Sequence, residues 1–536
     1  MTIDDLCRAH DLLFEHDGVV RVPFLVKGRL VSPPAITRRA AEAAFAGADP
    51  DAHYARLPDV QLLRDPVIER ADMRYTGEYF YQAFPAVDPF DLIETDYDRL
   101  VRGPYALTVD EVLAFLKAVA AALRESWAVL DRARTICRRV STLPHAYLDA
   151  AFATLAFGLD AVAAAEMLNN ELSVWGQPGR RFLDGWVELP ARIVPGVTPL
   201  LAQSLAGGMP VAEPAAAAPA IRAMPTRQLH ITAGNAPQVP IVSALRLILT
   251  KSAGVIKSPS EATLPAALLA LAAAAAAPDH PLTRNISLVY WKGGDEAVER
   301  ALFAPGAFDR IVVWGAPDAV SAVQARAMFT RVVAFNPRYG LSLIGREAFD
   351  GCLDEVAALA AQDVMINDQK ACSSSLVQYV EGTEAQVKAY AAALSDRLSA
   401  WDRLSPPFIP PVARGQIKRM RRGRYSRARW LAREGESDPA STVVIMPEEF
   451  DILEHPMSRL VVIRPVEQLQ DALRYLHQGV SMVGVYPETR RLALRDAIAA
   501  RGVSSVLPLG QCERLFAGGP QDGMMVLAEL VDWKNG

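Results

Sequence analysis

The sequence predicts an α/β protein built around parallel β-sheets. From residue 228 onward, short apolar runs alternate with helical segments of roughly 10 to 15 residues. The runs are almost continuously apolar, which is typical of strands covered by helices on both faces. Glycine or proline punctuates many of the turns between them. We therefore expect a doubly wound, Rossmann-type nucleotide-binding domain and a second α/β domain, preceded by a mostly helical N-terminal extension.

The N-terminal part is expected to pack on the nucleotide-binding domain. Residues 1–100 show no clear hydrophobic period, so we interpret them as an irregular arm. Helical patterns then dominate as far as Asn170, and Thr108 and Glu111 have the spacing of a helix capping box. Residues 207–225 are rich in proline, alanine and glycine, which is typical of a linker.

Five predicted strands define the nucleotide-binding unit. They are residues 228–232, 253–258, 285–291, 310–314 and 331–335. The helices between them are predicted at 239–249, after Pro259, at 295–303 and from Pro317. The usual glycine-rich dinucleotide motif follows none of these strands, but parallel strands can also bind a nucleotide at their carboxyl ends.

A second alternating stretch follows. Its predicted strands are residues 376–382, 442–446, 460–466 and 480–486, with a further apolar run at 503–509. Its predicted helices are residues 349–363, 383–398 and 466–477. We therefore divide the chain into an N-terminal region (1–227), a nucleotide-binding unit (228–336), a catalytic domain (337–502) and a C-terminal segment (503–536).

Composition excludes several classes of protein. The 536 residues are 51% hydrophobic and 22% charged, which excludes a disordered chain. A net charge of −5 argues against a nucleic-acid-binding protein, and five cysteines argue against a disulfide scaffold. We expect a cytoplasmic protein with no signal peptide and no metal site. The longest apolar run, 262–278, is alanine-rich and short, so we expect a buried helix and no membrane span.

Cys372 is the candidate nucleophile. It lies in the polar segment NDQKACSSS, two residues after Lys370. A nearby ammonium group would favour the thiolate, and small turn-forming residues would expose the sulfur. On local sequence alone, a buried and inert thiol has about equal weight. The other four cysteines lack such surroundings, and we interpret them as structural.

Further candidates follow three of the predicted strands. Asn235 could donate to an oxyanion, although a turn asparagine is the simpler interpretation. Lys257, followed by Ser260, could bind ribose hydroxyls or a phosphate, or could equally be a solvent-facing lysine. Gly315 and Ala316 open a helix whose first N–H groups could bind a cofactor, although a plain turn glycine is favoured locally.

The segment Arg414–Arg429 contains eight basic residues in sixteen and no acidic residue. A solvated loop is the first interpretation. The functional alternative is a docking site for an acidic partner or for a phosphate-bearing carrier.

Together these residues resemble the aldehyde dehydrogenase superfamily in their order: Asn235, Lys257, Gly315 and Cys372. The closer resemblance is to the acyl-CoA reductase family, the fatty-acid reductases of bacterial luminescence operons. The segments DQKACSS, HPMSRLVVIRPV and GGPQDGMMVLAELVDW carry this resemblance, which covers roughly residues 60–535.

The resemblance implies a cytoplasmic, NADPH-dependent reductase that forms a homo-oligomer.

 

In such an enzyme, the Cys372 thiolate attacks an activated acyl group and expels the carrier thiol. Asn235 and the backbone N–H of Cys372 stabilise the oxyanion, and the resulting acyl-cysteine is reduced to an aldehyde. Lys257, Ser260, Gly315, Ala316 and Glu454 are the implied cofactor-binding residues, with NADPH as the cofactor. The implied substrate is a long-chain acyl-CoA or an acyl-carrier thioester, which a partner protein could deliver.

Two positions depart from the family patterns. The C-terminal motif usually has histidine before Asp-Gly, where this chain has Gln521. The wider superfamily has a water-activating glutamate about 34 residues before the cysteine, where this chain has Arg338. A reductase needs no hydrolytic base, so the second departure favours reduction over oxidation.

Three alternatives remain open. The same fold could oxidise aldehydes, or the chain could be an acyl-transfer subunit without hydride chemistry. The basic segment could also bind nucleic acid, which the net charge disfavours.

The basic segment generates a test. If it captures the acyl donor, neutralising Arg421, Arg422 and Arg424 together should raise the KM for the donor, and added salt should weaken the capture. Initial rates at graded donor concentrations measure this effect. An unchanged KM at low ionic strength would favour the solvated loop.

Overall fold

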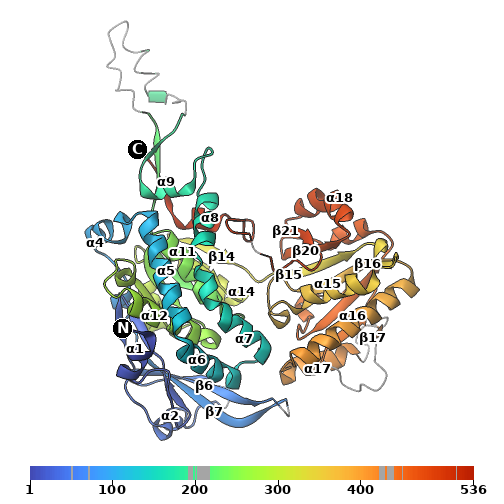
Figure 1. Cartoon of the computed structure of the whole chain (residues 1–536), viewed down its shortest axis with the longest axis horizontal. Coiled ribbons are helices and arrows are strands. Elements are labelled where there is room, and N and C mark those ends of the chain that lie inside the picture. Colours follow the sequence, from blue (N-terminus) through green and yellow to red (C-terminus); the bar gives the residue numbers. More distant parts are fainter. Residues whose placement is uncertain are drawn as a thin grey trace.

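The computed structural model has two lobes (Figure 1). The first lobe contains the N-terminal elements and the nucleotide-binding strands, and the second contains the Cys372 segment and the strands that follow it. The structure describes residues 1–49, 52–70, 73–190, 218–421, 440–449, 451–514 and 516–536, with the short stretches 197–198, 201, 204 and 429–430.

A seven-stranded sheet forms the centre of the first lobe, in the order β14-β13-β10-β11-β12-β3-β4. The five strands β10 to β14 are parallel, and β3 is antiparallel to β12. The bounds are β3 (Phe24–Val26), β4 (Arg29–Val31), β10 (Arg227–Ile231), β11 (Ala253–Lys257), β12 (Ile286–Val289), β13 (Arg310–Trp314) and β14 (Arg331–Phe335). The parallel sheet expected from the alternating pattern is confirmed.

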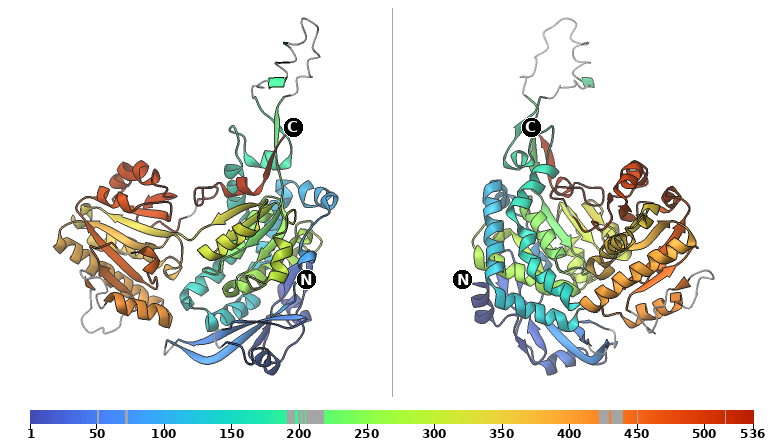
Figure 2. Two further views of the ribbon diagram at one scale, coloured as in Figure 1. Left: turned by 180° about the vertical axis from the view of Figure 1, so that it is seen from behind. Right: turned by 45° about the vertical axis from the view of Figure 1, so that its right-hand side comes forward.

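Helices cover both faces of this sheet (Figures 1 and 2). They include α5 (Val109–Glu125), α6 (Trp127–Val140), α11 (Val239–Leu249), α12 (Thr263–Ala276), α13 (Glu296–Leu302) and α14 (Pro317–Arg326). The predicted capping box begins α5, because Thr108 and Glu111 each bond the other's backbone N–H. The alanine-rich helix α12 is almost wholly buried, as expected.

Among the described residues, no single helix has the length and apolar character needed to cross a membrane. One pair of segments, His145–Leu159 and Ala161–Glu171, meets the criteria together by length and composition only, and it is bent by 60°.

The interpretation of residues 1–100 as an irregular arm is wrong. Most of their strands form a five-stranded sheet in the order β1-β2-β7-β6-β5. The bounds are β1 (Glu15–His16), β2 (Val19–Arg21), β5 (Tyr54–Arg56), β6 (Val60–Glu69) and β7 (Arg74–Pro85). The aromatic run Tyr79–Tyr81 lies within β7, where aromatic side chains are favoured. The register of β6 and β7 shifts near Pro66, which explains why no regular period was visible.

The remaining N-terminal helices complete the first lobe. They are α1 (Ile3–His10), α2 (Arg38–Ala44), α3 (Pro89–Leu92), α4 (Tyr97–Arg102), α7 (His145–Thr154), α8 (Ala161–Glu171) and α9 (Gly179–Asp184).

The second lobe is built on another seven-stranded sheet, in the order β17-β18-β19-β16-β15-β20-β21. All its pairings are parallel except that of β17 with β18. The strand bounds are β15 (Tyr339–Ile344), β16 (Ser375–Glu381), β17 (Arg429–Trp430), β18 (Thr442–Ile445), β19 (Leu460–Val466), β20 (Val480–Tyr486) and β21 (Ser505–Pro508). The helices are α15 (Leu353–Met365), α16 (Glu384–Leu404), α17 (Pro411–Arg421) and α18 (Glu488–Ala499).

Two elements of this lobe differ from expectation. The central strand β15 was not predicted, because Gly340 lies within its short sequence and Pro337 and Gly345 flank it. Gly340 is required there, since a side chain at this position would lie about 2.2 Å from the backbone oxygen of Ser373. The predicted helix 466–477 is a short 3₁₀ helix, η8 (Leu469–Tyr475).

The chain ends in the first lobe. After β21 it returns through α19 (Val526–Leu530) to β22 (Asp532–Asn535), which forms a three-stranded sheet with β9 (Ala220–Met224) and β8 (Val187–Glu188). The last part of the predicted linker therefore contains β9, and residues 207–217 lie outside the described residues. The division of the chain into four regions, with its three boundaries, stays a prediction.

Candidate active site

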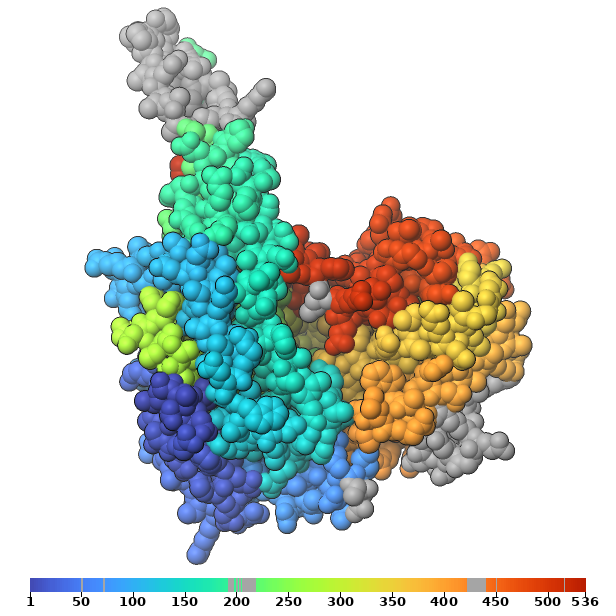
Figure 3. Space-filling model, in the orientation of Figure 1, coloured from blue at the N-terminus to red at the C-terminus, as the bar shows by residue number. Residues whose placement is uncertain are grey.

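The candidate residues come from two sheet edges. Register pairs Ile231 with both Lys257 and Val313, so the loops after β10, β11 and β13 leave the same carboxyl-end edge of the first sheet. These loops carry Asn235, Ser260 and Gly315. In the second sheet, the segments that contain Cys372 and Glu454 precede the neighbouring parallel strands β16 and β19, at the amino-end edge. Figure 3 shows the surface hollowed between the lobes.

A hydrogen bond joins the two edges. Nδ2 of Asn235, after β10, donates to the backbone oxygen of Lys370 at 3.1 Å. The structure therefore places Asn235 against the segment that carries Cys372, two residues further on. The Asn235 side chain is exposed, so its amide is accessible from solvent.

The Cys372 residue is solvent-exposed, but protein atoms surround its sulfur closely. This desolvation raises the pKa of the Cys372 thiol to about 11, and the negative charge of Asp522 is the second-largest cause of the rise. The backbone is fixed by Ser481, whose hydroxyl donates to the Cys372 carbonyl at 2.5 Å. The residue is thus exposed at the surface with its backbone held in place, while the desolvated thiol favours its protonated form at neutral pH.

The expected activation of Cys372 by Lys370 is wrong. The Lys370 ammonium group donates to the hydroxyl of Thr142 at 2.7 Å, in the segment between α6 and α7. Burial lowers the pKa of Lys370, and the largest effects on the Cys372 thiol come from other groups, which leave its pKa raised. Lys370 is two residues from Cys372 in the sequence, but its ammonium group binds Thr142 instead of the thiol.

Asp522 is a site residue that the sequence analysis missed. Its carboxylate lies 3.7 Å from Nε of Arg338, and both side chains are largely buried. Burial raises the pKa of Asp522, while Arg338 and Arg246 oppose the rise. An acidic group is therefore present near Cys372, although it comes from the C-terminal motif and not from the position that the superfamily uses.

Gln521 has a structural partner. Its side-chain oxygen accepts a hydrogen bond from the guanidinium of Arg246 on α11. Arg246 also lies 5.5 Å from the ring centroids of Trp314 and Phe335, which stack on each other at 3.7 Å. Burial lowers the pKa of Arg246 to about 10. An amide accepts this hydrogen bond without adding charge, which explains how glutamine can replace histidine here.

Lys257 is buried at the end of β11. Its ammonium group lies 5.6 Å from the ring centroids of both Tyr290 and Trp291, and it donates to the Ser258 carbonyl at 3.3 Å. Desolvation lowers the pKa of Lys257 to about 8, against the opposing charges of Glu299 and Glu261. The interpretation of Lys257 as a solvent-facing lysine is wrong.

The neighbouring turns can accommodate a cofactor. Ser260 and Glu261 lie in η3 (Ser260–Ala262), and the Glu261 carboxylate packs closely against Gly234. Gly315 precedes the N-cap Ala316 of α14, and a side chain at Gly315 would lie 3.2 Å from Ala319. Glycine at these two positions thus allows the neighbouring Glu261 and Ala319 to pack closely against the backbone at the strand ends.

Glu454 ends the short helix η7 (Ile452–Glu454) and is half-buried. The structure places it at the same sheet edge as Cys372 and does not test its role toward a cofactor.

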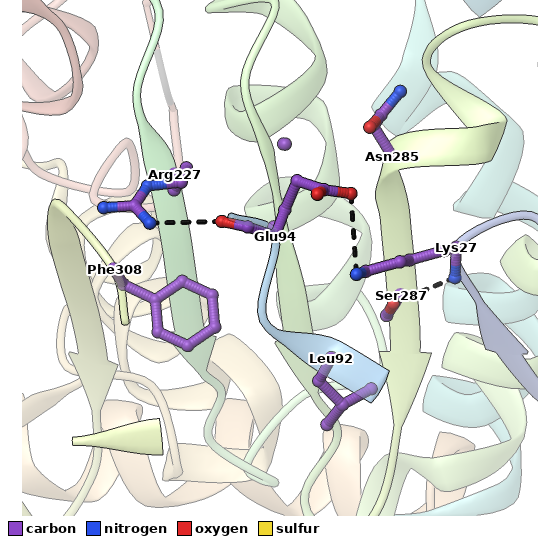
Figure 4. Close-up of a pocket in the computed structure, with 9 residues that line it drawn as sticks. Lys27, Leu92, Glu94, Arg227, Asn285, Ser287 and Phe308 are labelled. Atoms are coloured by element: carbon purple, nitrogen blue, oxygen red, sulfur yellow. Dashed lines mark hydrogen bonds and ion pairs between the residues drawn. The ribbon is translucent and has the colours of Figure 1, made fainter. Parts of the chain in front are cut away.

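The opposite edge of the first sheet holds a cavity of about 10 Å³, with room for at most one water molecule (Figure 4). Its cations already have partners. Lys27 lies 3.5 Å from the Glu94 carboxylate, and Arg227 donates to the Glu94 carbonyl at 3.1 Å. This cavity is far too small for a substrate.

The predicted basic loop begins as a helix, since α17 extends to Arg421. Arg421 bonds the hydroxyl of Thr442 at 2.5 Å, which assigns it a structural contact. Residues 422–428, with Arg422 and Arg424, lie outside the described residues.

These features define the class of the protein. The whole chain superposes on aldehyde dehydrogenase 21 from Physcomitrella patens, solved with succinate, at a TM-score of 0.65 and 13% identity, covering 97% of this chain and 98% of that one. An NADP-dependent glyceraldehyde-3-phosphate dehydrogenase from Bacillus halodurans C-125, solved with NADP, gives 0.62 and 12% over 96% and 98%. The fold is aldehyde dehydrogenase-like, as predicted.

The sequence comparison places the chain in a narrower family than the fold does. Residues 220–533 match the family described as Acyl-CoA reductase (LuxC), and the chain belongs to that family. A long-chain acyl-protein thioester reductase from Photorhabdus laumondii is 28% identical over 322 residues, which is 58% of this chain. The match spans 64% of that relative's length. The predicted family resemblance is confirmed.

The charge of Asp522 generates a prediction. In D522N the negative charge is lost, so the pKa of Cys372 should fall from about 11 and the thiolate fraction at pH 8 should rise. Alkylation of Cys372 by iodoacetamide should then become several-fold faster, because thiolate is the reactive form. Mass spectrometry of the Cys372 peptide follows the reaction, with C372S as the blank. An equal or slower rate would show that Asp522 does not control the thiol.

Proposed function

We propose that this chain reduces a long-chain fatty acyl thioester to the aldehyde through an acyl group held on Cys372, with NADPH as the cofactor. The observation that carries the proposal is the exposed Cys372, bonded through its segment to Asn235 at the edge where the nucleotide-binding strands end. Membership of the acyl-CoA reductase (LuxC) family supports the reaction, and the similarity to the long-chain acyl-protein thioester reductase from Photorhabdus laumondii supports the thioester substrate.

Cys372 performs the covalent step. Its sulfur attacks the acyl carbonyl carbon, a new C–S bond forms, and the C–S bond to the carrier breaks. The carrier leaves as a thiol with the proton that Cys372 gives up. The Asn235 amide, together with the Cys372 backbone N–H, stabilises the oxyanion of the tetrahedral intermediate. For this Asn235 exchanges its bond to the Lys370 carbonyl for one to the substrate.

The cofactor would be held by the strand ends of the first lobe. Bound NADPH supplies the hydride that reduces the acyl carbon. Lys257 would provide a buried ammonium group, and Gly315 and Ala316 would offer backbone N–H groups at the start of α14. Ser260 would donate to the 2′-phosphate, and Glu454 would contact the nicotinamide ribose. These residue types fit the group, since charge, hydroxyl and open backbone lie along one edge.

Three kinds of acyl donor are compatible with the proposed reaction. Acyl-CoA, an acyl-carrier protein or an acylated partner would each present a thioester to Cys372. Basic residues of the segment 414–429 would attract the phosphates or acidic groups of such donors. Because Arg421 is bonded to Thr442, Arg422 and Arg424 become the better test positions.

One observation favours aldehyde oxidation as a second candidate. Asp522 is an acid near Cys372, and an acid there could activate water to hydrolyse the acyl-cysteine. Its ion pair with Arg338 opposes this role, because the guanidinium favours the charged, weakly basic form. A long-lived acyl-cysteine in the absence of cofactor would support reduction, and rapid release of free acid would support oxidation.

Acylation of Cys372 is the first prediction. Exposure to acyl-CoA without cofactor should add the mass of one acyl group, and C372S should not gain it. Because the thiol pKa is raised to about 11, the rate of acylation should increase with pH through the neutral range. Intact-mass kinetics at graded pH measure both effects. An adduct that persists in C372S would disprove the assignment.

Cofactor preference is the second prediction. NADPH should bind more tightly than NADH, because Lys257 and Ser260 can pair with the 2′-phosphate. The carboxylate of Glu261 opposes this binding, and like-charge repulsion costs about 1 kcal/mol or more near a protein surface. E261Q should therefore bind NADPH several-fold more tightly, and NADH no more tightly, in fluorescence titrations.

The pH dependence of NADPH binding provides a second test of the site at Lys257. Since the pKa of Lys257 is lowered to about 8, NADPH binding should weaken as pH rises through that value and the ammonium group is lost. Tighter binding of NADH in the wild-type protein would mean that Glu261 faces the ribose, and the NADPH assignment would be wrong.

A further inference from the structure

The segment before Cys372 has an unusual backbone. Asn367, Asp368 and Gln369 have φ values of 48°, 54° and 64°, in the left-handed region that asparagine and aspartate adopt mostly as single residues and glutamine rarely adopts. A second run of three follows Glu454, where Met457, Ser458 and Arg459 have φ values of 53°, 52° and 62°. Such strain persists only where the surroundings hold it.

The two strained turns hold each other. Arg459 is fully buried, and its Nε donates to the carboxylate of Asp368 at 2.6 Å. The side chain of Gln369 donates to the Leu460 carbonyl at 2.6 Å, which joins the same two turns a second time.

The remaining guanidinium donors of Arg459 reach the α16 region. Nη1 donates to Asp402 at 2.7 Å, and Nη2 donates to the Ser405 carbonyl at 2.6 Å. A planar group that bonds three partners at once fixes its own position, and lysine could not reproduce this geometry.

Residues of the first lobe also bind the segment before Cys372. The hydroxyl of Tyr147 on α7 bonds the side chain of Asn367, and Thr142 accepts from Lys370. On the other side of the turn, the hydroxyl of Ser374 donates to the Ile366 carbonyl at 2.8 Å. Apart from the bonds of Arg459 to the α16 region, each of these contacts involves a residue of the segment 366–374, which includes Cys372.

We propose that Arg459 is a positioning residue, which holds the left-handed turn 367–369 so that the Cys372 sulfur faces the site beside Asn235. The same guanidinium fixes the turn that follows Glu454, so it couples the nucleophile segment to the proposed cofactor-facing segment. The inference rests on the proposed function only in taking Cys372 as the nucleophile.

The test compares R459M and R459K with R227M. Arg227 is an equally matched control, because it is buried, pairs with Asp309 at 2.8 Å, and lies at the opposite edge of the first sheet. Three quantities are measured on each full-length variant: the melting temperature, the pH profile of Cys372 alkylation, and the rate of acylation by acyl-CoA.

Loss of Arg459 should free the turn and admit water to the sulfur. The alkylation profile of R459M should move to lower pH, while acylation should slow by about tenfold or more, since misplacement of the reacting atom is costly. R459K should give a partial effect. R227M should lower the melting temperature and leave both Cys372 properties within about twofold of wild type.

A folded R459M with wild-type alkylation and acylation would overturn the proposal. If R459M does not fold, Q369A removes only the bond to Leu460 and should shift the same two properties in the same directions; an unchanged Q369A would then overturn it. Alkylation needs neither acyl donor nor cofactor. A shifted alkylation profile without any acylation in the wild type would therefore support the role of Arg459 while contradicting the proposed function.

Discussion

Three consecutive left-handed residues cannot hold their conformation alone, and the turn before Cys372 contains them. Left-handed backbone costs roughly 1 to 2 kcal/mol for each non-glycine residue. The buried ion pair of Arg459 with Asp368, the hydrogen bond of Gln369 and the contacts from α7 together offset that cost. The position of Cys372, the proposed nucleophile, therefore depends on groups that are far apart in the sequence.

The same arrangement connects the two lobes. The carboxyl ends of the nucleotide-binding strands carry Asn235, and the amino ends of the second sheet carry Cys372. Burial at this junction changes the ionisable groups in opposite ways, because it raises the pKa of the Cys372 thiol and lowers the pKa of Lys257. Both groups are thereby less charged at neutral pH than the same side chains are in water.

Much of this fold could be predicted from the sequence, because a buried parallel strand is recognisable as a short and nearly continuous run of apolar residues. All five strands of the nucleotide-binding unit have it, and α11 was predicted with its observed bounds. The N-terminal sheet and β15 were missed, since proline, glycine and mixed polarity obscure the period. Of the candidate site, the sequence order identified the segments of Asn235 and Cys372 that the structure joins. The sequence could not identify Asp522 as a neighbour of the Cys372 thiol, and it could not show that Lys370 binds Thr142. Both contacts depend on how segments that are far apart in the sequence pack together.

The central claim is that the acyl group on Cys372 leaves as an aldehyde formed by hydride transfer. A single-turnover experiment tests it: isolated acyl-protein is mixed with NADPH that carries deuterium at the transferable C4 position, and the products are analysed by mass spectrometry. The account predicts one aldehyde for each acyl group lost, with one deuterium at the aldehyde carbon and unmodified Cys372. Release of the free fatty acid, or an aldehyde without deuterium, would contradict it.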